Sequence, residues 1–334
     1  MQKLSVALIG YGYWGKRLFK TLQKIHSVRT VAVCDKNQQT INELQSLDSE
    51  IQLTKRYQDI VSNKNIDAVV IATPAGTHYR IAMDSLKSGK HVLLEKPMAL
   101  KKAHARFLDK FADKKKLILM VDHTYLYAPE IRVAKQTIDS GIMGNIRLIE
   151  ATRVGPGQYK YDCDVIWDFA PHDISILYYL LGIPRELSAM NSCHLDQHRI
   201  DVSNLYFKFT NGREAFVYLS WLSPIKIRKI LIVGTEKTLL IEQDGRESKI
   251  YLYPSSCYFR NSGQADNDFQ SVKNLRVLSG LPYYEPLSNV CHEFVQCIIN
   301  HTQPLSSGHL GYEVVNIIEM IHQLKTQSGK VIIP

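Results

Sequence analysis

The chain has 334 residues, of which 45% are hydrophobic, and its formal net charge is +9 at pH 7. This length suits about two globular domains, and no apolar run approaches the roughly 20 residues that a membrane span needs, so we expect no membrane partner. The basic excess suits an anionic small ligand. Because Lys and Arg are dispersed and form no nucleic-acid-binding signature, we expect no nucleic-acid partner.

The first third of the chain alternates between two apolar patterns. Short buried runs predict strands at residues 4–9, 30–34, 68–72, 91–94 and 117–121, and longer runs predict helices at residues 16–24, 36–47, 79–88 and 100–114. This alternation favours a parallel sheet with right-handed crossovers.

A glycine-rich turn joins the first strand to the first helix. Gly10 permits the tight turn, Gly12 lets the backbone approach a pyrophosphate, and Gly15 allows close helix packing. Asp35, at the end of the second strand, is placed to bond a ribose 2′-hydroxyl, and its carboxylate repels a 2′-phosphate. The pattern therefore predicts NAD(H) rather than NADP(H) as the cofactor, a preference that the neighbouring Lys36 softens.

A charged pair ends a buried strand further along. Glu95 and Lys96 follow the apolar run at residues 91–94, and Pro97 stops it. Burying a lysine is costly unless a partner compensates its charge, but the carboxyl end of a parallel strand is where α/β sheets bind ligands. We therefore expect Lys96 to serve a ligand; the alternative is a structural ion pair with Glu95.

The pattern of apolar residues changes in the second part of the chain. Alternating apolar residues predict strands at residues 146–152, 186–192, 201–210, 214–222, 229–233 and 238–242. Asn211-Gly212 and Asp244-Gly245 are hairpin-turn signals, so we expect a second domain with an antiparallel sheet. Both alternating sets between residues 215 and 222 are apolar, so we expect both faces to be covered, one of them by a second subunit.

The cysteines are scattered and include no Cys-x-x-Cys pair, which is typical of free thiols in a reducing cytoplasm. Cys291, His292, Cys297 and His301 could be imagined as a metal site. They do not share one helical face, so we favour simple packing and expect no metal.

These motifs together resemble one family. The residues that carry the resemblance are the glycine turn, Thr73-Pro74 with His78, Glu95-Lys96-Pro97, Asp168 with His172, and the closing residues 328–333. Over essentially its whole length the chain resembles the glucose–fructose oxidoreductase / inositol dehydrogenase (Gfo/Idh/MocA) family. That family implies a Rossmann domain, here residues 1–122, and a C-terminal α+β domain with a large open, mostly antiparallel sheet, here residues 123–334. It also implies a homodimer or homotetramer formed through that sheet.

The resemblance also implies roles for three residues. Lys96 matches the lysine between the nicotinamide ribose and the substrate hydroxyl, and Asp168 and His172 match the proton-handling pair. The chemistry is coherent, because a histidine side chain exchanges protons near neutral pH and a lysine stabilises charge developing on oxygen. The alternatives are a helix cap for Asp168 and a buried structural role for His172.

Local signals place the catalytic pair on a helix. Asp168 is the expected N-cap, Pro171 is tolerated in the first turn, and Gly182 ends the helix. Asp168 and His172 then lie one turn apart on one face.

The expected cofactor contacts are Gly10, Gly12, Tyr13, Trp14, Gly15, Asp35, Lys36, Thr73, Pro74, His78, Glu95 and Lys96. Of these, His78 is expected to pack near the cofactor and to take no part in the chemistry.

The expected substrate follows from positions at which this chain differs from many members of the family. The segment from Asp122 to Tyr125 lacks the arginine of many relatives, which weakens an inositol or free-sugar interpretation and resembles nucleotide-sugar oxidoreductases that act at a sugar C3. The expected substrate contacts are Tyr125, Arg153, Tyr159 and Asp173, the last of which alternatively only adds charge to its helix N-terminus. We therefore expect hydride transfer between nicotinamide and a secondary hydroxyl or keto carbon of a nucleotide-sugar. The alternatives are an inositol or free-sugar dehydrogenase and a non-catalytic dinucleotide-binding regulator.

Overall fold

The structure is a computed structural model, and it describes residues 3–47, 51–156, 163–244, 247–254, 276–277, 285–324 and 329–333. The chain forms two compact units, Met1–Tyr127 with Tyr284–Glu319, and Ala128–Tyr283 with Met320–Pro334. The expected ranges, 1–122 and 123–334, differ from these units chiefly in the segment 284–319, which packs with the first unit.

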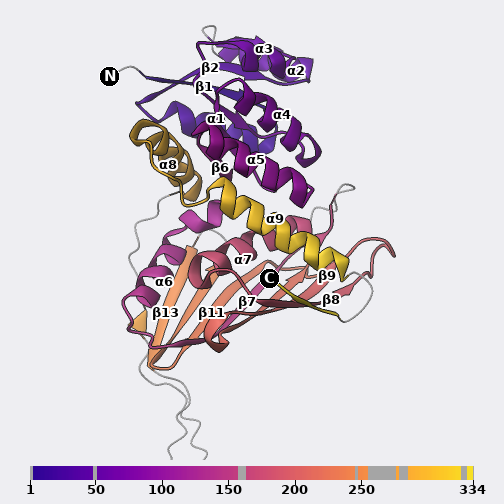
Figure 1. Cartoon of the computed structure of the whole chain (residues 1–334), viewed down its shortest axis with the longest axis vertical. Coiled ribbons are helices and arrows are strands. Elements are labelled where there is room, and N and C mark those ends of the chain that lie inside the picture. The colour runs from indigo at the N-terminus through magenta and orange to yellow at the C-terminus, as the bar shows by residue number, and fades with distance from the viewer. Residues whose placement is uncertain are drawn as a thin grey trace, which may run out of the picture. The chain divides into compact units, whose positions relative to one another are not determined.

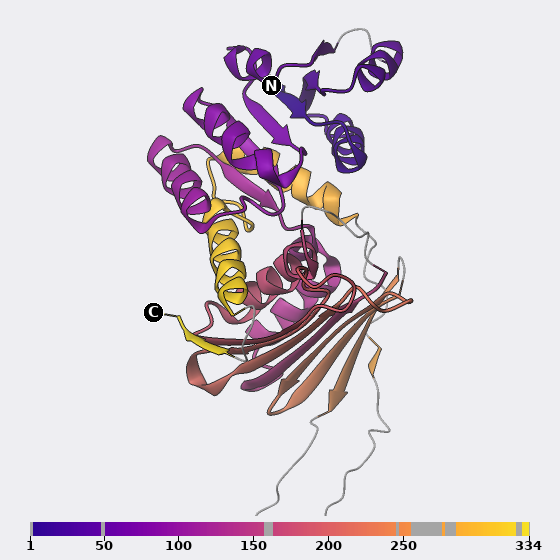
Figure 2. The same ribbon diagram turned by 90° about the vertical axis from the view of Figure 1, so that its right-hand side faces the viewer.

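The first unit is built on a six-stranded parallel sheet, flanked by helices (Figures 1 and 2). Its strands, in the spatial order β3-β2-β1-β4-β5-β6, are β1 (Leu4–Ile9), β2 (Val28–Cys34), β3 (Gln52–Thr54), β4 (Ala68–Ile71), β5 (His91–Glu95) and β6 (Leu119–Asp122). Its helices are α1 (Tyr13–Gln23), α2 (Gln38–Leu47), α3 (Tyr57–Ser62), α4 (Ala75–Lys87) and α5 (Lys102–Lys115).

This arrangement confirms the predicted parallel sheet. Every position of β4 and β6 is buried, because helices cover both faces. The strand order reverses between β1 and β4, and such a switch point is where open α/β sheets bind ligands. The short elements β3 and α3 were not predicted, since three and six residues are too few for a periodic pattern to show.

The segment 284–319 joins the first unit through apolar packing and hydrogen bonds. Helix α8 (Pro286–Asn300) contacts α1 and the 3-10 turn η1 (Thr124–Tyr127). The buried Tyr127 hydroxyl lies 3.1 Å from Glu293 Oε1 and 3.0 Å from the Ser306 hydroxyl. Helix α9 (Gly308–Gln323) begins in this unit and ends in the second. The sequence did not reveal this association, because residues 128–283 separate the two parts of the unit.

The second unit is built on a nine-stranded sheet in the order β14-β13-β12-β11-β7-β10-β9-β8-β15. Its strands are β7 (Ile146–Val154), β8 (Glu186–Ser192), β9 (Val202–Lys208), β10 (Glu214–Ser220), β11 (Ile227–Gly234), β12 (Lys237–Asp244), β13 (Glu247–Pro254), β14 (Arg276–Val277) and β15 (Gly329–Ile332). Pairing is antiparallel except between β7 and β10, so the sheet is mixed and mostly antiparallel, as expected.

Both hairpins that the sequence predicted are present. Asn211 and Gly212 have φ angles of 65° and 71°, in the left-handed region, and lie in a three-residue loop, residues 210–212, that the Phe209 N–H closes by donating to the Arg213 carbonyl oxygen at 2.8 Å. Strands β12 and β13 also pair antiparallel, although their connecting residues 245–246 lie outside the described residues. Most of residues 254–286, which the sequence predicts to form a long loop, likewise lie outside them.

One face of this sheet carries helices α6 (Pro129–Asp139) and α7 (Val165–Leu181) (Figure 2). In β10, Ala215 and Val217 are buried on the helix side, whereas Phe216 and Tyr218 alternate with them and are 46% and 40% exposed. The chain thus covers one face itself and leaves aromatic side chains on the other.

The start of α7 corrects a prediction. Asp164, not Asp168, is the N-cap, and its Oδ1 accepts the Trp167 backbone N–H at 3.1 Å. Pro171 consequently lies inside the helix rather than at its first residues, and Asp168 lies in the first turn. Gly182 ends the helix as predicted. Both aspartates are good caps, so local sequence alone did not discriminate between them.

Across the described ranges, no helix combines the length and the apolar character that crossing a membrane requires.

Candidate active site

The glycine turn leaves open space in front of α1. A Cβ on Gly10 would lie 2.6 Å from the Ala72 carbonyl oxygen, and one on Gly15 would lie 2.0 Å from the Gly10 carbonyl oxygen, whereas nothing lies within 4 Å of the same position on Gly12. Gly12 is the N-cap and supplies no side-chain acceptor to the first turn of α1. First-turn amides need an acceptor, so this helix end fits a pyrophosphate.

Asp35 is tied to the same turn. Its Oδ2 accepts the Tyr11 backbone N–H at 2.7 Å, and its Oδ1 accepts the Asn37 backbone N–H at 2.8 Å. Asp35 is half-buried, and the neighbouring Lys36 is exposed. The carboxylate retains lone pairs for a further donor, so this arrangement fits the ribose of a dinucleotide.

Tyr13 and Trp14 are the most exposed part of the turn. They are 67% and 41% exposed, and the Arg17 guanidinium lies 4.6 Å and 5.3 Å from their ring centres. A cation at this range is attracted to an aromatic face, so Arg17 orients both rings beside the start of α1.

His78 joins the loops that follow β4 and β5. Its Nε2 lies 2.7 Å from the Thr73 carbonyl oxygen, and its Nδ1 lies 2.8 Å from the Pro97 carbonyl oxygen. His78 is buried, and this burial lowers the pKa of its imidazole against the opposing effect of the two carbonyls. Pro74 is the N-cap of α4, so His78 ties this helix to the loop that carries Lys96.

Glu95 and Asp122 form an acidic pair beside Lys96. The two acids occupy paired positions of β5 and β6, and the charge of Asp122 acts on Glu95. Burial, followed by the charge of its neighbour, raises the pKa of Glu95, and burial raises the pKa of Asp122. Sequence reasoning noted Asp122 only as a departure from a pattern; matching the ends of the two strands would have revealed the pair.

His123 is a second buried group next to Lys96. It is 1% exposed, and burial, followed by the charge of Lys96, lowers the pKa of His123 to about 3. The imidazole is therefore neutral. Lys96 itself is half-buried, and Tyr125, an expected substrate contact, is half-buried in η1.

In the second unit, α7 carries the expected proton-handling residues. Asp168 and His172 lie one turn apart and are both half-buried, as their spacing predicted. The neighbouring Asp173 contacts Arg153 of β7 instead of solvent: the Arg153 Nε–Asp173 Oδ2 distance is 2.6 Å and the Nη2–Oδ1 distance is 3.1 Å. These two expected substrate contacts thus bind each other, and Tyr159 lies outside the described residues.

Asp164 and His322 hold the start of α7. His322 Nε2 lies 2.8 Å from Asp164 Oδ2, and its ring stacks on Trp167 with centroids 5.7 Å apart. Sequence reasoning missed this support because His322 lies far along the chain.

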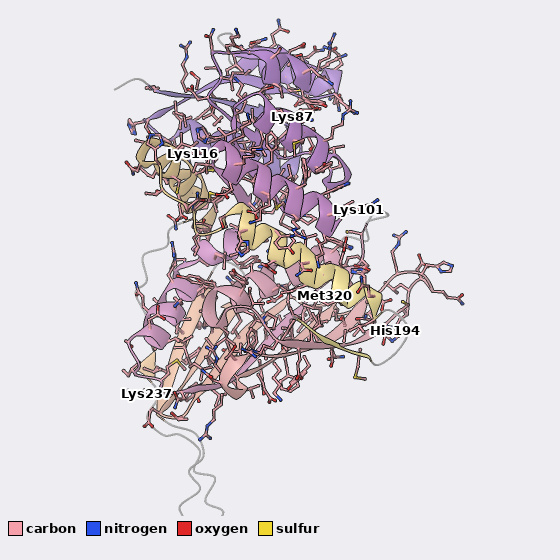
Figure 3. The ribbon with its side chains drawn as sticks, in the orientation of Figure 1. Lys87, Lys101, Lys116, His194, Lys237 and Met320 are labelled. Carbon is pink, nitrogen blue, oxygen red and sulfur yellow. The ribbon has the colours of Figure 1, made fainter. Side chains whose placement is uncertain are left out.

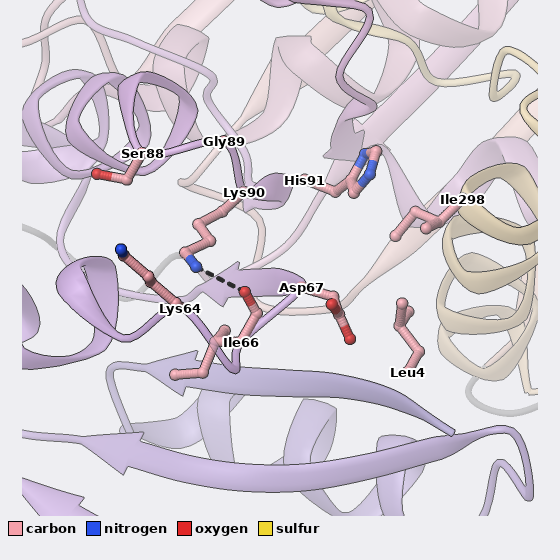
Figure 4. A pocket seen from close by; sticks show the side chains of 9 residues that line it. All are labelled: Leu4, Lys64, Ile66, Asp67, Ser88, Gly89, Lys90, His91 and Ile298. Atoms are coloured by element: carbon pink, nitrogen blue, oxygen red, sulfur yellow. Dashed lines mark hydrogen bonds between the residues drawn. The ribbon is translucent and has the colours of Figure 1, made fainter. Parts of the chain in front are cut away.

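A separate pocket of about 370 Å³ lies away from these residues, at the amino-terminal edge of the parallel sheet (Figure 4). Lys90 lines it and donates to the carbonyl oxygens of Asn63 and Ile66 at 2.6 Å and 2.7 Å. These bonds hold the loop between α3 and β4, so we assign Lys90 a structural role.

Exposed lysines lie on separate elements of the first unit, such as Lys87 on α4 and Lys116 after α5 (Figure 3). Within the described part of the chain, His, Cys, Asp and Glu side chains form no group of three or more that could hold a metal ion.

Two family models match the chain. An oxidoreductase family with an NAD-binding Rossmann fold matches residues 4–123, and the GFO/IDH/MocA C-terminal domain matches residues 131–240. A solved levoglucosan dehydrogenase, in complex with NADH and L-sorbose, shares the fold with a TM-score of 0.86 over 100% of both chains, at 21% identity.

Curated relatives act on several classes of molecule. The 2,7-anhydro-N-acetylneuraminate hydratase of Mediterraneibacter gnavus is 25% identical over 76% of this chain and 74% of its own length. The UDP-N-acetylglucosamine 3-dehydrogenase of Acidithiobacillus ferrooxidans is 31% identical over 45% of this chain and 47% of its own. The inositol 2-dehydrogenase/D-chiro-inositol 3-dehydrogenase of Lactiplantibacillus plantarum is 30% identical over 53% of this chain and 52% of its own. The last two matches span about half of each protein.

Proposed function

Because the chain belongs to the Gfo/Idh/MocA family of NAD-binding oxidoreductases, we propose that it transfers a hydride between nicotinamide and a secondary hydroxyl or keto carbon of a nucleotide-linked sugar. The observation that carries this proposal is Lys96, which directly follows β5 beside a buried acidic pair, on the same sheet edge as the glycine turn. A lysine kept at this edge is suited to polarise an oxygen atom of a bound ligand.

The proposed chemistry divides between cofactor and protein. When bound, the nicotinamide supplies the site that takes or gives the hydride. Lys96 bonds the reacting oxygen and stabilises its negative charge, while His172 exchanges the proton of that oxygen. Asp168, one turn before His172, orients the imidazole and stabilises its protonated form. The Arg153–Asp173 pair fixes α7 to β7 and so restricts the position of His172.

Residues of the turn region bind the cofactor in this proposal. The α1 amides and Gly12 receive the pyrophosphate, and Asp35 receives the ribose hydroxyls. The remaining proposed contacts with the cofactor are Tyr13, Trp14, Lys36, Thr73, Pro74, His78 and Glu95.

Two observations support a nucleotide-linked substrate. A relative named UDP-N-acetylglucosamine 3-dehydrogenase is 31% identical over its matched part. The net charge of +9 suits a substrate with a diphosphate. Tyr125, half-buried in η1, is the proposed sugar contact in the first unit.

A panel of paired substrates tests this proposal. Purified protein with NAD would be given UDP-N-acetylglucosamine and N-acetylglucosamine, UDP-glucose and glucose, and myo-inositol, with NADH formation as the readout. We expect kcat/KM to be at least about 100-fold higher for a nucleotide-linked sugar than for its free sugar. Turnover of only free sugars or inositol would contradict the nucleotide requirement. Tight NADH binding without any turnover would favour the alternative that the protein is a non-catalytic dinucleotide-binding regulator.

The exposed aromatic face of the large sheet supports a second proposal, a homo-oligomer. Phe216 and Tyr218 lie exposed on β10, and the Phe216 ring packs 5.1 Å from that of Tyr206 on β9. A second copy would bury this self-complementary surface. Light scattering should report a dimer or tetramer, and Phe216→Lys/Tyr218→Lys should report a monomer; a monomeric parent chain would refute the proposal.

The buried Cys34, Cys291 and Cys297 are free thiols. They support the proposal that the protein works in a reducing compartment.

A further inference from the structure

Two acidic side chains meet at the carboxyl edge of the parallel sheet. The register of β5 and β6 pairs Glu95 with Asp122, and the exposed fractions of the two residues are only 9% and 1%. Residues at matched positions of neighbouring strands point to the same face, and the charge of Asp122 acts on Glu95. Water is thus largely excluded from a pair of acids that repel each other when both are ionised.

Each carboxyl group has one oxygen engaged by a donor. Glu95 Oε2 accepts the Lys96 backbone N–H at 3.2 Å, and Asp122 Oδ1 accepts the Thr124 hydroxyl at 2.6 Å. The remaining oxygens, Glu95 Oε1 and Asp122 Oδ2, are buried, and no N–H or hydroxyl donor among the described residues reaches either of them. Ionised carboxylates only accept hydrogen bonds, so a bond between these two oxygens requires a proton on one of them.

The charges around the two acids also favour one proton on the pair. Lys96 is the cation that acts on both acids. Burial lowers the pKa of His123 to about 3 and raises the pKa of the Cys291 thiol on α8 well above its usual range, so both groups are uncharged near neutral pH. Two ionised acids beside one lysine would leave a buried net negative charge, whereas one shared proton makes the cluster neutral.

We propose that Glu95 and Asp122 hold one proton between them, and that Asp122 is thereby a positioning residue that presents Lys96 with a single negative charge instead of two. The shared proton depends on the two acids and on the charges around them, and not on the proposed function. The role toward Lys96 rests on the proposed function, in which that lysine polarises the substrate oxygen. A doubly ionised pair draws the Lys96 ammonium toward the acids and away from its ligand, so loss of the proton at alkaline pH slows turnover.

The isosteric variant Asp122→Asn separates the effect of the proton from the effect of the hydrogen bonds. Its amide oxygen can still accept from the Thr124 hydroxyl, and its N–H groups can donate to Glu95 Oε1, so both hydrogen bonds persist while the titrating proton is gone. Asp67→Asn is the matched control, because Asp67 is exposed and its Oδ2 accepts the Ser5 backbone N–H at 2.8 Å.

Infrared difference spectroscopy of the protein without cofactor detects the proton directly. At neutral pH, the parent-minus-variant spectrum should contain the carbonyl stretch of a protonated carboxyl group for Asp122→Asn and for Glu95→Gln, and should lack it for Asp67→Asn. A spectrum without this band for either acid of the pair would overturn the shared proton.

Thermal unfolding across pH gives an independent readout. A carboxyl group whose folded-state pKa is raised stabilises the fold fully below its unfolded pKa, which is about 4.3 for Glu, and this contribution is lost as the pH rises through the folded-state pKa. The parent Tm should therefore fall with rising pH relative to the Tm of Asp122→Asn. Parallel Tm profiles for the two proteins would contradict the proposal.

Kinetics then test the role toward Lys96, using the sugar that the substrate panel identifies. The parent kcat should fall at alkaline pH, and this fall should be absent in Asp122→Asn. A parent-like alkaline fall in this variant would refute the positioning role. If no sugar is turned over, the proposed function and the role toward Lys96 both fail, whereas the infrared spectra still decide whether the proton is shared.

Discussion

Arg153 and Asp173 form a buried, two-point ion pair that joins β7 to α7. The Nε–Oδ2 and Nη2–Oδ1 distances are 2.6 Å and 3.1 Å, and the side chains are only 6% and 2% exposed. A planar guanidinium can donate two parallel N–H···O bonds to one carboxylate, which makes this kind of ion pair strong and geometrically specific. The pair therefore fixes the helix that carries His172.

Breaking this pair on one side should be costly. Arg153→Met or Asp173→Asn leaves an uncompensated buried group, so the free energy of unfolding should fall by about 3–5 kcal/mol. The double variant Arg153→Met/Asp173→Leu removes both charges and should be less destabilised than the sum of the single variants. Urea unfolding of the four proteins measures the difference; additive losses would show that the two charges are not coupled.

Gly12 and Gly15 should respond differently to alanine. A Cβ on Gly15 meets the Gly10 carbonyl oxygen at 2.0 Å, so Gly15→Ala should destabilise the fold by about 1–3 kcal/mol. Gly12→Ala meets no atom and should stay within about 0.5 kcal/mol of the parent. Its NADH affinity should nevertheless fall about tenfold or more, because the methyl group occupies the path of the pyrophosphate. Urea unfolding and NADH fluorescence titration separate the two effects, and unchanged NADH affinity in Gly12→Ala would count against the assigned cofactor position.

His172→Ala should abolish proton exchange without affecting the cofactor. We expect kcat to fall by at least about 100-fold, with the NADH dissociation constant unchanged. His198→Ala is the control, since His198 is an exposed histidine of the same unit. Retention of the parent kcat in His172→Ala would remove this residue from the mechanism.

Asp35 should set the choice between the two dinucleotides. Removing its charge should raise the NADP-to-NAD ratio of kcat/KM by about tenfold, because a 2′-phosphate is no longer repelled. Asp35 also accepts two backbone N–H groups, so Asp35→Asn, which keeps one acceptor, should be compared with Asp35→Ala. A ratio that stays constant in both variants would exclude a ribose role for Asp35.

His123 should make stability depend on pH in the acidic range. Burial lowers its folded-state pKa to about 3, whereas its unfolded pKa is about 6.5. A histidine with a lowered pKa contributes its stability above pH 6.5, and that stability is lost as the pH falls toward the folded value. Relative to His123→Gln, the parent should lose up to about 1.4 kcal/mol per pH unit in this window. Urea unfolding between pH 4 and 7 tests this, and equal slopes for the two proteins would show that His123 titrates normally in the fold.

Local patterns in the sequence determined much of the architecture. The alternation of short apolar strands with helices predicted the parallel sheet, and the glycine turn with Asp35 predicted the dinucleotide site that the family match supports. The left-handed φ angles at Asn211 and Gly212 confirm a turn that two residues specify by themselves. Such signals are readable because they depend on near neighbours in the chain.

Only the tertiary structure decided which distant groups meet. Glu95 faces Asp122 because two strands pair in one register, and Arg153 reaches Asp173 because α7 packs on the face of the large sheet. The choice of Asp164 over Asp168 as helix cap goes with its contact to His322, which lies far along the chain. Register and packing bring together residues whose spacing in the sequence carries no period, so no local pattern reports them.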